Sequence, residues 1–95
     1  MRYAPLETPS FSRTRKKLPP ALREALDREV VRVCDSPTLG EAKRGDLQGV
    51  RVHKFSVVGQ LYLLAYWPDD KAQTVTFLAL GGHENFYRDL KRYLR

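Results

Sequence analysis

The spacing of apolar residues changes along the chain from a helical period to a strand period. Through residues 21–33 apolar positions recur every three or four residues, which places them on one stripe of an amphipathic helix. Asp35-Ser36-Pro37 is predicted to end this helix. A shorter basic helix precedes it, with Thr8 as its N-cap and Pro9 as its first residue, and extends to about Lys17. A proline-rich break separates the two helices.

The second half of the chain contains three strand-length segments rich in Val, Leu, Phe, Tyr and Thr. These segments are Val50 to Val58, Gln60 to Trp67 and Gln73 to Leu80. Gly59 marks the first turn, and Pro68 to Lys71 marks the second. Because such short connections join antiparallel neighbours, the segments predict a three-stranded meander. The middle segment is apolar on both alternating faces, so it is predicted to be the central, doubly covered strand.

Three further segments complete the predicted element order. Tyr3 to Leu6 has strand character interrupted by Pro5, which fits an edge strand. Thr38 to Gly49 is polar and punctuated by glycine, which predicts a loop. From Phe86 onward apolar residues recur every four positions, which predicts a last helix from His83 to about Leu94. The predicted order is an edge strand, two helices, three strands and one helix, an α+β fold.

Length and charge limit the functional classes. The 95 residues are enough for a single domain spanning 1–95. There are 17 Lys and Arg against 11 Asp and Glu, a net charge of +6 that favours a polyanionic partner such as nucleic acid, an acidic protein or an anionic membrane surface. A protein that is basic without such a partner is the alternative. No run is long enough to span a bilayer, and the start of the chain lacks the apolar stretch of a signal peptide.

Motifs for metals and cofactors are absent from the sequence. There is no glycine-rich phosphate loop, and no Cys/His set has the spacing of a metal site. The sequence therefore predicts neither a metal ion nor a cofactor. The single cysteine, Cys34, lies on the apolar side of the second helix, which indicates a buried packing residue. A chain without an internal disulfide suits the reducing cytoplasm.

The last predicted helix carries a row of chemically useful side chains. His83, Tyr87 and Lys91 are four residues apart and therefore stack along one helix face. His83 follows Gly81-Gly82 at the helix start, where backbone N–H groups favour an anion such as phosphate. The alternative is that His83 is an ordinary first-turn residue and that Tyr87 covers the edge of the core.

The first strand of the meander carries three basic side chains. Arg51 and His53 share one face of this strand, and Lys54 points to the other. Because a charge in the middle of a sheet is costly unless one face is open, this pattern predicts a polar groove on one sheet face. The alternative is an edge strand that uses lysine to discourage aggregation.

Other side chains are candidates for RNA contacts. Lys43 and Arg44 in the predicted loop could contact phosphates. The densest basic cluster, Arg13 to Lys17, fits either phosphate binding or a solvated helix face. Three aromatic residues fit core packing better than base stacking: Tyr62, Tyr66 and Trp67.

Three segments, in this order and spacing, resemble RelE/ParE-superfamily toxins of bacterial type II toxin–antitoxin systems. They are Leu47 to Phe55, Tyr62 to Tyr66 and Leu80 to Tyr87, within a resemblance that spans about Phe11 to Arg95. The resemblance implies an N-terminal helical hairpin packed on a twisted antiparallel sheet, with a C-terminal helix. In RelE-type members the concave face of the sheet holds mRNA in the ribosomal A site, where the RNA 2′-hydroxyl attacks the adjacent phosphate.

The resemblance also implies roles for individual residues. Lys54 falls at a groove lysine, which would stabilise the phosphorane, and Tyr87 at a C-terminal aromatic residue that orients the substrate. His83 falls where RelE itself carries arginine but where other branches place a catalytic histidine, so it is the expected general acid or base. Six basic residues are the expected contacts to RNA phosphates: Arg51, His53, Lys43, Arg44, Arg88 and Lys91.

Two departures from the family pattern keep other functions open. A second groove lysine would fall at Ser56 and a groove arginine at Leu63, and both positions are uncharged here. ParE-type members share the fold, lack the nuclease residues and poison DNA gyrase by binding, which is the alternative to an mRNA endoribonuclease. A third reading is an inactive binding domain. An acidic or amphipathic antitoxin is the expected partner in every case, together with the ribosome and mRNA for the nuclease.

Overall fold

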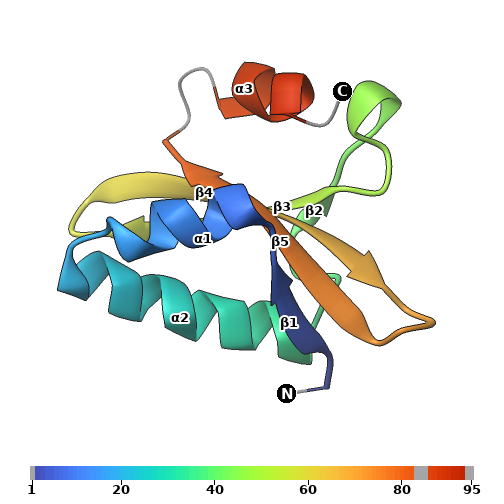
Figure 1. The fold of residues 1–95 in the computed structure, drawn as a ribbon, viewed down its shortest axis with the longest axis horizontal. Helices are drawn as coiled ribbons and strands as arrows, with labels where there is room; N and C mark the ends of the chain where they lie inside the picture. The colour runs from blue at the N-terminus through green and yellow to red at the C-terminus, as the bar shows by residue number, and fades with distance from the viewer. Residues whose placement is uncertain (1, 83–85, 94–95) are drawn as a thin grey trace.

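The computed structural model describes residues 2–82 and 86–93. Its elements follow in the order β1 (Ala4–Glu7), α1 (Pro9–Lys16), α2 (Pro20–Asp35), β2 (Glu41–Ala42), the 3₁₀-helix η1 (Gly45–Leu47), β3 (Arg51–Val57), β4 (Gln60–Asp69), β5 (Thr74–Gly81) and α3 (Phe86–Tyr93). The strands form one sheet in the order β1-β5-β4-β3-β2, with β1 parallel to β5 and the other neighbours antiparallel. Helices α1 and α2 cover one face of this sheet and α3 covers the other (Figure 1).

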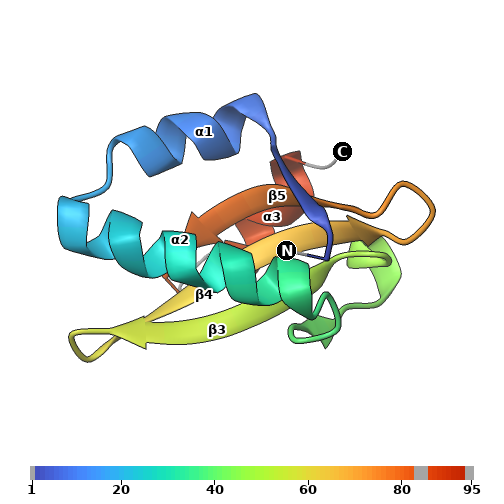
Figure 2. The same ribbon diagram turned by 90° about the horizontal axis from the view of Figure 1, so that it is seen from below.

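The first two helices form a hairpin that is joined by side-chain contacts. The Thr8 side chain accepts a hydrogen bond from the backbone N–H of Phe11 at 3.1 Å, so the predicted N-cap is confirmed. The Arg15 guanidinium makes two parallel hydrogen bonds to the Asp27 carboxylate, at 2.9 and 2.7 Å, and so links α1 to α2. Arg23 donates to carbonyl groups at the end of α1, where the helix has no partners of its own. Seen from below, α2 runs across the strands and α1 lies alongside β5 (Figure 2).

The sheet separates two hydrophobic cores. The core under α1 and α2 contains Phe11, Leu26, Val33, Cys34, Phe55, Leu64, Tyr66, Val75 and Phe77. The core under α3 contains Leu47, Val50, Val52, Leu63, Ala65, Leu78, Phe86 and Leu90. Strand β4 contributes to both cores, and its residues 63–66 are all fully buried, so the predicted central strand is confirmed. Cys34 is also fully buried, as predicted, and burial raises the pKa of its thiol.

The predicted α+β order is confirmed, but the sheet is larger than predicted and is mixed. The predicted loop from Thr38 to Gly49 contains β2 and η1, because β2 pairs for two residues with the edge of β3 and needs no apolar alternation of its own. The predicted second turn begins too early, because Pro68 and Asp69 still pair with β5. Asp69 Oδ1 instead accepts hydrogen bonds from two backbone N–H groups of the turn that follows. The predicted limits of the last helix, His83 and Leu94, lie outside the described residues.

The turn between β3 and β4 places a valine in a strained conformation. Val58 and Gly59 both have positive φ, 49° and 77°, as a two-residue hairpin turn of type I′ requires. Glycine adopts this conformation without cost, but a β-branched side chain does not. The Val58 side chain is 97% exposed, so no packing compensates for the strain.

We expect Val58→Asn to stabilise the protein by about 1 kcal/mol, because asparagine tolerates positive φ and Asn-Gly is a favoured pair in this turn. The midpoint of thermal unfolding should rise by roughly 4–8 °C. Val58→Ala is the matched control, because it removes the exposed apolar group but keeps a side chain that disfavours positive φ. An equal gain from both variants would attribute the effect to surface hydrophobicity instead of strain.

Candidate functional site

Lys54 lies on the α3 side of the sheet, at the edge of the core that α3 covers. Side chains alternate along β3, and Val52 belongs to the core under α3, so Lys54 points to that same side. Lys54 is exposed, and its neighbour across the sheet is the buried Leu63 of β4. The Lys54 ammonium group is therefore in solvent, next to the apolar core under α3.

Three more polar side chains surround this position. Lys43 Nζ lies 2.9 Å from Glu41 Oε1 and 4.9 Å from the centre of the Tyr87 ring. The hydrogen bond from Lys43 lowers the pKa of the Glu41 carboxyl, and the positive charges of Lys43 and Lys54 lower it further. The same hydrogen bond raises the pKa of Lys43, so both groups are charged at neutral pH. We call Glu41, Lys43, Lys54 and Tyr87 the Lys54 face.

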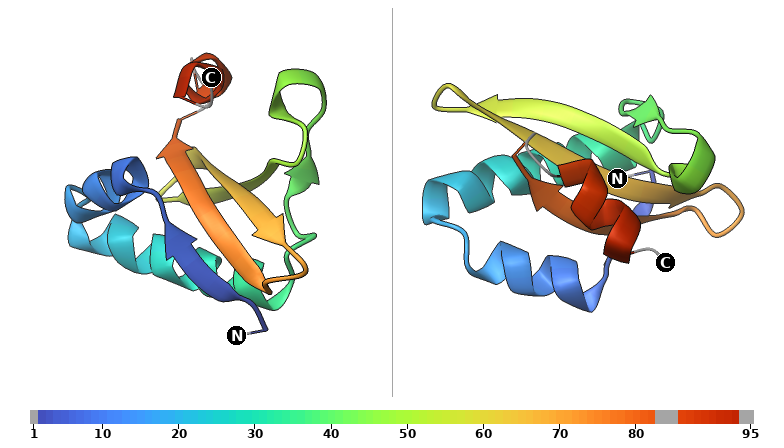
Figure 3. Two further views of the ribbon diagram at one scale, coloured as in Figure 1. Left: turned by 45° about the vertical axis from the view of Figure 1, so that its right-hand side comes forward. Right: turned by 90° about the horizontal axis from the view of Figure 1, so that it is seen from above.

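The Lys54 face joins elements that are distant in the sequence. Lys43 follows β2, Lys54 lies on β3 and Tyr87 lies on α3, so tertiary packing brings together side chains that the sequence analysis had treated separately. Figure 3 shows α3 lying across the sheet, with the segment that holds β2 and η1 beside it. Two ammonium groups against one carboxylate leave this surface with a net positive charge that can bind a phosphodiester, and the phenol can orient a base or sugar next to it.

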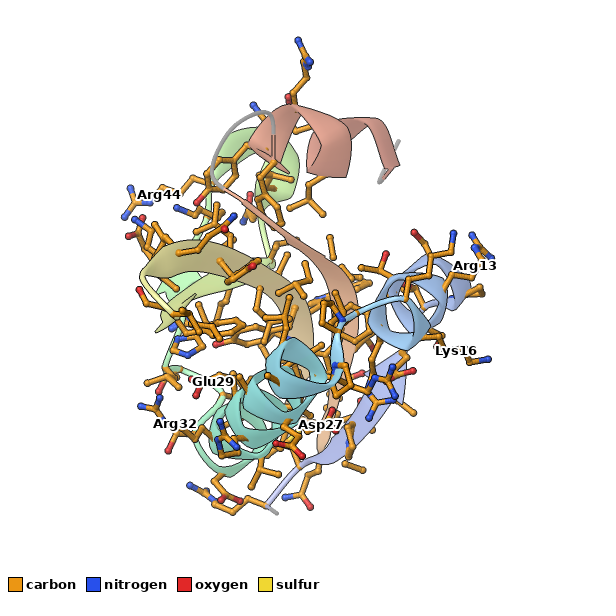
Figure 4. The ribbon with its side chains drawn as sticks, turned by 90° about the vertical axis from the view of Figure 1, so that its left-hand side faces the viewer. Arg13, Lys16, Asp27, Glu29, Arg32 and Arg44 are labelled. Atoms are coloured by element: carbon orange, nitrogen blue, oxygen red, sulfur yellow. The ribbon has the colours of Figure 1, made fainter. Side chains whose placement is uncertain are left out.

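The structure describes the remaining predicted residues of α3 only in part. Tyr87 is half-buried, whereas Arg88 and Lys91 are exposed. His83, the predicted proton-transfer residue, lies outside the described residues. Arg44, in the segment before η1, is exposed and projects on the opposite side of the molecule from Arg13 and Lys16 of α1 (Figure 4).

His53 and Arg51 lie on the opposite side of the sheet from Lys54. The His53 side chain is nearly buried under α2, and its Nε2 atom lies 2.6 Å from Glu29 Oε1. Its ring also stacks on Phe55, with 6.1 Å between ring centres. Arg51 lines a pocket of about 320 Å³ at the end of α2. The structure therefore does not bring the predicted phosphate contacts Arg51 and His53 together with Lys54. Glu29 is not predictable as a partner of His53, because nothing in the helical pattern distinguishes it from a solvated acid.

We expect His53→Ala to reduce the free energy of unfolding by about 2 kcal/mol, because it removes a buried ring and leaves the Glu29 carboxylate without this partner. Urea unfolding of the purified protein measures the loss. Glu29→Gln combined with His53→Ala should cost less than the sum of the two single changes, because the pair acts together. Unchanged stability with lost RNA binding would instead assign His53 to the RNA interface.

The two positions that depart from the family pattern differ in their surroundings. Ser56 is exposed on the same side of β3 as Lys54, two residues further along. Leu63 is fully buried in the core under α3. A charge at Leu63 would have to enter that core, so this chain uses the position for packing and leaves the positive charge of the site to Lys43 and Lys54.

The densest basic cluster has a structural part and an exposed part. Arg15 pairs with Asp27, and this pairing raises the pKa of its guanidinium. Arg13 and Lys16 of α1 and Lys17 at its C-cap are exposed. In the described part of the chain, no cluster of three or more His, Cys, Asp or Glu side chains could hold a metal ion. Within the same residues, no helix is long and apolar enough to cross a membrane.

The chain matches the model of a protein family over residues 6–91, and the family is described as the ParE-like toxin of type II bacterial toxin–antitoxin systems. No curated protein matches the chain. Among solved structures, it resembles the RelBE2 toxin–antitoxin complex of Mycobacterium tuberculosis, with 25% identity, a TM-score of 0.76 and coverage of 87% of this chain and 100% of that chain.

Two structures from E. coli are similar in fold. A free double mutant of the toxin RelE has 22% identity and a TM-score of 0.76, and the match covers all of both chains. The intact RelBE toxin–antitoxin complex has 24% identity and a TM-score of 0.72, with coverage of 86% of this chain and 98% of that chain. These likenesses support the α+β fold across nearly the whole chain.

Proposed function

Because this chain belongs to the ParE-like toxin family of type II bacterial toxin–antitoxin systems, we propose that it arrests growth by cleaving mRNA on the ribosome. The observation that carries the proposal is the Lys54 face. Lys43 and Lys54 provide two ammonium groups on one surface, and the Tyr87 ring lies beside Lys43. An exposed cation next to a second cation and a phenol suits a phosphodiester, which is anionic and carries a base or sugar for the ring to contact.

The proposed reaction is attack of an RNA 2′-hydroxyl on the adjacent phosphate. A bond forms between the 2′-oxygen and phosphorus, and the bond from phosphorus to the 5′-oxygen breaks. The 2′-hydroxyl loses one proton, and the departing 5′-oxygen receives another, which leaves a cyclic phosphate and a 5′-hydroxyl end. His83 transfers one of these two protons, since an unperturbed histidine pKa of about 6.5 suits either role at neutral pH.

The charged groups of the Lys54 face act on the phosphate. Negative charge accumulates on the phosphate oxygens as the fifth bond to phosphorus forms, and Lys54 stabilises that charge. Lys43 is held between Glu41 and Tyr87, so its ammonium group is already positioned, while Glu41 offsets part of its charge. Tyr87 orients the nucleotide through its ring.

Gyrase poisoning is the second candidate function, and one observation favours it. Ser56 and Leu63 lack the charges that RelE-type nucleases carry, and Leu63 is fully buried. A gyrase poison would need no catalytic charge at either position. An inactive domain that only binds an antitoxin is distinguished from both by a lack of toxicity.

Inducible expression separates these functions. We expect translation to stop within minutes and primer extension on a reporter mRNA to reveal new 5′-hydroxyl ends, because the proposed reaction produces them. A DNA-damage response and filamentation before any cut transcript would identify the gyrase poison. Normal growth at high toxin level would indicate the inactive binding domain.

The role of Lys54 can be tested with a single substitution. We expect Lys54→Ala to lower the rate of mRNA cleavage by about a hundredfold, the range seen when one group that stabilises developing charge is removed. Cleavage of reporter mRNA by purified protein with ribosomes measures the rate. Lys17→Ala is the matched control, because Lys17 is an exposed lysine at the C-cap of α1 and should leave the rate unchanged. Equal rates for both variants would remove Lys54 from the mechanism.

We also propose that the chain is held by a cognate antitoxin in the cytoplasm. The RelBE structures that it resembles are toxin–antitoxin complexes. With a net charge of +6, the chain favours an acidic or amphipathic segment that wraps the basic helices or covers α3. Co-purification with the product of the neighbouring reading frame tests this partner. A protein that stays abundant and harmless without that product would contradict it.

A further inference from the structure

A second concave surface lies on the α3 side of the sheet, at the end of β4 that is far from Lys54. It encloses about 590 Å³, and its lining includes Leu6 of β1, Trp67 of β4, Thr74 and Thr76 of β5 and the turn between β4 and β5. The sheet register aligns Leu6, Thr76 and Trp67 in one row across three neighbouring strands. We call this surface the Trp67 pocket.

The structure separates the three aromatic residues of the middle strand that the sequence analysis considered together. Tyr66 is fully buried, and Tyr62 packs against the core under α1 and α2. Trp67 is 58% exposed and points to the opposite face. It is exposed because Phe86 and Leu90 of α3 cover Leu63 and Ala65 of β4 but not Trp67. Of the three rings, that of Trp67 therefore offers a flat apolar face to a ligand.

One edge of the indole lies close to the backbone. A Cβ atom on Gly49 would lie 3.4 Å from Trp67 Nε1, so the backbone of the β3 approach passes close to the ring. Across the pocket Leu6 is 49% exposed, which gives the ring an apolar neighbour. A flat ligand can therefore stack on the exposed face of Trp67 with an apolar side chain nearby.

The polar lining of the pocket favours hydrogen-bond donors over phosphates. Asp69 Oδ1 accepts from two backbone N–H groups of the turn, and Asp70 Oδ1 accepts from the Tyr3 hydroxyl at 2.8 Å. Each carboxylate is thus oriented through one oxygen, and within the described residues no hydrogen bond engages its second oxygen. The hydroxyl groups of Thr74 and Thr76 can donate or accept. Two carboxylates beside a single lysine would repel a phosphate and attract amino groups.

We propose that the Trp67 pocket binds a nucleobase with an exocyclic amino group, from single-stranded RNA that flanks the cleaved bond, and that it contributes to sequence preference. The ring stacks on Trp67, and the amino group donates to Asp69 or Asp70. Cytosine, adenine and guanine carry such a group, and uracil does not. This inference rests on the proposed nuclease function, since it places the pocket on the path of the substrate.

The position of the pocket relative to Lys54 supports a shared RNA strand. Leu63 pairs with Lys54, and Trp67 lies four residues further along β4 on the same face. That separation is about 13 Å at about 3.3 Å per residue, a span of a few nucleotides. Helix α3 lies between the two surfaces, so the strand would pass alongside α3 with its backbone near Lys54 and a flanking base at Trp67.

The chain carries its own probe for this binding event, because Trp67 is its single tryptophan. Fluorescence of the purified toxin is measured during titration with oligocytidylate and oligouridylate of equal length. We expect oligocytidylate to quench Trp67 fluorescence and to bind several-fold more tightly than oligouridylate. No quenching by either RNA, or equal affinity for both, would overturn the proposal. Quenching by an antitoxin peptide alone would assign the surface to that partner and would also overturn it.

Variants separate stacking from base recognition. By anisotropy of labelled oligocytidylate, Trp67→Ala should bind roughly tenfold more weakly, while Trp67→Phe should keep most of the affinity because it keeps an aromatic face. Asp70→Asn should reduce the difference in affinity between oligocytidylate and oligouridylate. If Trp67→Phe binds oligocytidylate as weakly as Trp67→Ala does, stacking on the ring is contradicted. If Asp70→Asn leaves the difference in affinity between the two RNAs unchanged, recognition of the amino group by Asp70 is contradicted.

A cleavage-deficient variant distinguishes failure of this inference from failure of the proposed function. His83→Ala should show the same quenching by oligocytidylate as the wild type, because binding at Trp67 does not require cleavage. If wild-type protein cuts reporter mRNA but RNA does not quench its Trp67 fluorescence, the Trp67 proposal fails and the nuclease function stands. If quenching is base-selective but no transcript is cut, the nuclease proposal fails and the pocket remains an RNA-base site.

Discussion

Replacing His83 with alanine is expected to abolish growth arrest and to lower the rate of mRNA cleavage by about a thousandfold, within the range for loss of a general acid or base. The expectation rests on the position of His83 in the family pattern and on the pKa of about 6.5 of an ordinary histidine. Inducible expression with primer extension on a reporter mRNA measures both effects. The unfolding midpoint should be unchanged, because the proposed role of His83 is proton transfer to the substrate.

The chain offers a matched control for this experiment, because it contains two histidines. His53 is nearly buried against Glu29, so His53→Ala should lower stability while cleavage per folded molecule is retained below its unfolding temperature. If His83→Ala loses cleavage but keeps stability, and His53→Ala loses stability but keeps cleavage, the two histidines have separate roles in proton transfer and in folding. Undiminished cleavage by His83→Ala would remove histidine from the mechanism and strengthen the gyrase alternative.

Tyr66→Phe is expected to reduce the free energy of unfolding by about 3 kcal/mol, although it removes one oxygen atom. The Tyr66 hydroxyl accepts a hydrogen bond from Gly40 N–H and donates one to Pro37 C=O, both at 2.7 Å. Burial raises the pKa of this hydroxyl, so it remains a neutral donor. Its loss leaves two backbone groups of the segment after α2 without partners, and Gly40 is buried. The unfolding midpoint should fall by roughly 10–20 °C.

Tyr62→Phe is the control for this substitution. Tyr62 stacks on Phe55 with 5.9 Å between ring centres, and its hydroxyl has no hydrogen bond to any described residue. Removal of that hydroxyl should change the free energy of unfolding by less than about 0.5 kcal/mol. Thermal unfolding of both variants measures the difference. Equal losses would attribute the effect to the tyrosine rings and not to the bonds of Tyr66.

Gly40 is required for the same contact. A Cβ atom at this position would lie 2.7 Å from the Tyr66 hydroxyl oxygen and 2.9 Å from the backbone carbon of Val52. Both neighbours belong to the packed sheet and cannot move aside cheaply. The close approach of residue 40 to β3 and β4 places the following residues, including Lys43, beside the sheet. Stability at Tyr66 and geometry at the Lys54 face are therefore linked through this segment.

The sequence predicted the elements whose signals are local. Thr8 and Pro9 marked the start of α1 because capping depends on residues within one turn. The middle strand was identified as central because a strand that is buried on both sides must be apolar on both sides. The mutual arrangement on β3 was also predictable, since Lys54 must point away from Arg51 and His53 whichever layer covers each face.

The features that the sequence missed depend on distant partners. Strand β2 forms because β3 offers it an edge for pairing, and β1 pairs in parallel with β5, which lies far from it in the sequence. Neither pairing leaves a periodic pattern in so few residues. Glu29 is one of several acids on α2, and its contact with His53 appears only when α2 packs on β3.

For the candidate site, too, local sequence determined some features and tertiary packing determined the others. The residue types that suit RNA chemistry, namely the basic groups and the aromatic residues, were evident from the amino-acid sequence alone. Alternation along a strand determines which side chains share a face, but the packed helices determine which face is closed and which is open. Helix α3 packs on β4 without covering Trp67, so that residue is exposed. Its neighbour Tyr66 points to the other face, where it is buried in the core under α1 and α2. The same packing puts Lys43 beside Tyr87, because contact between distant segments depends on how the layers stack and not on local sequence.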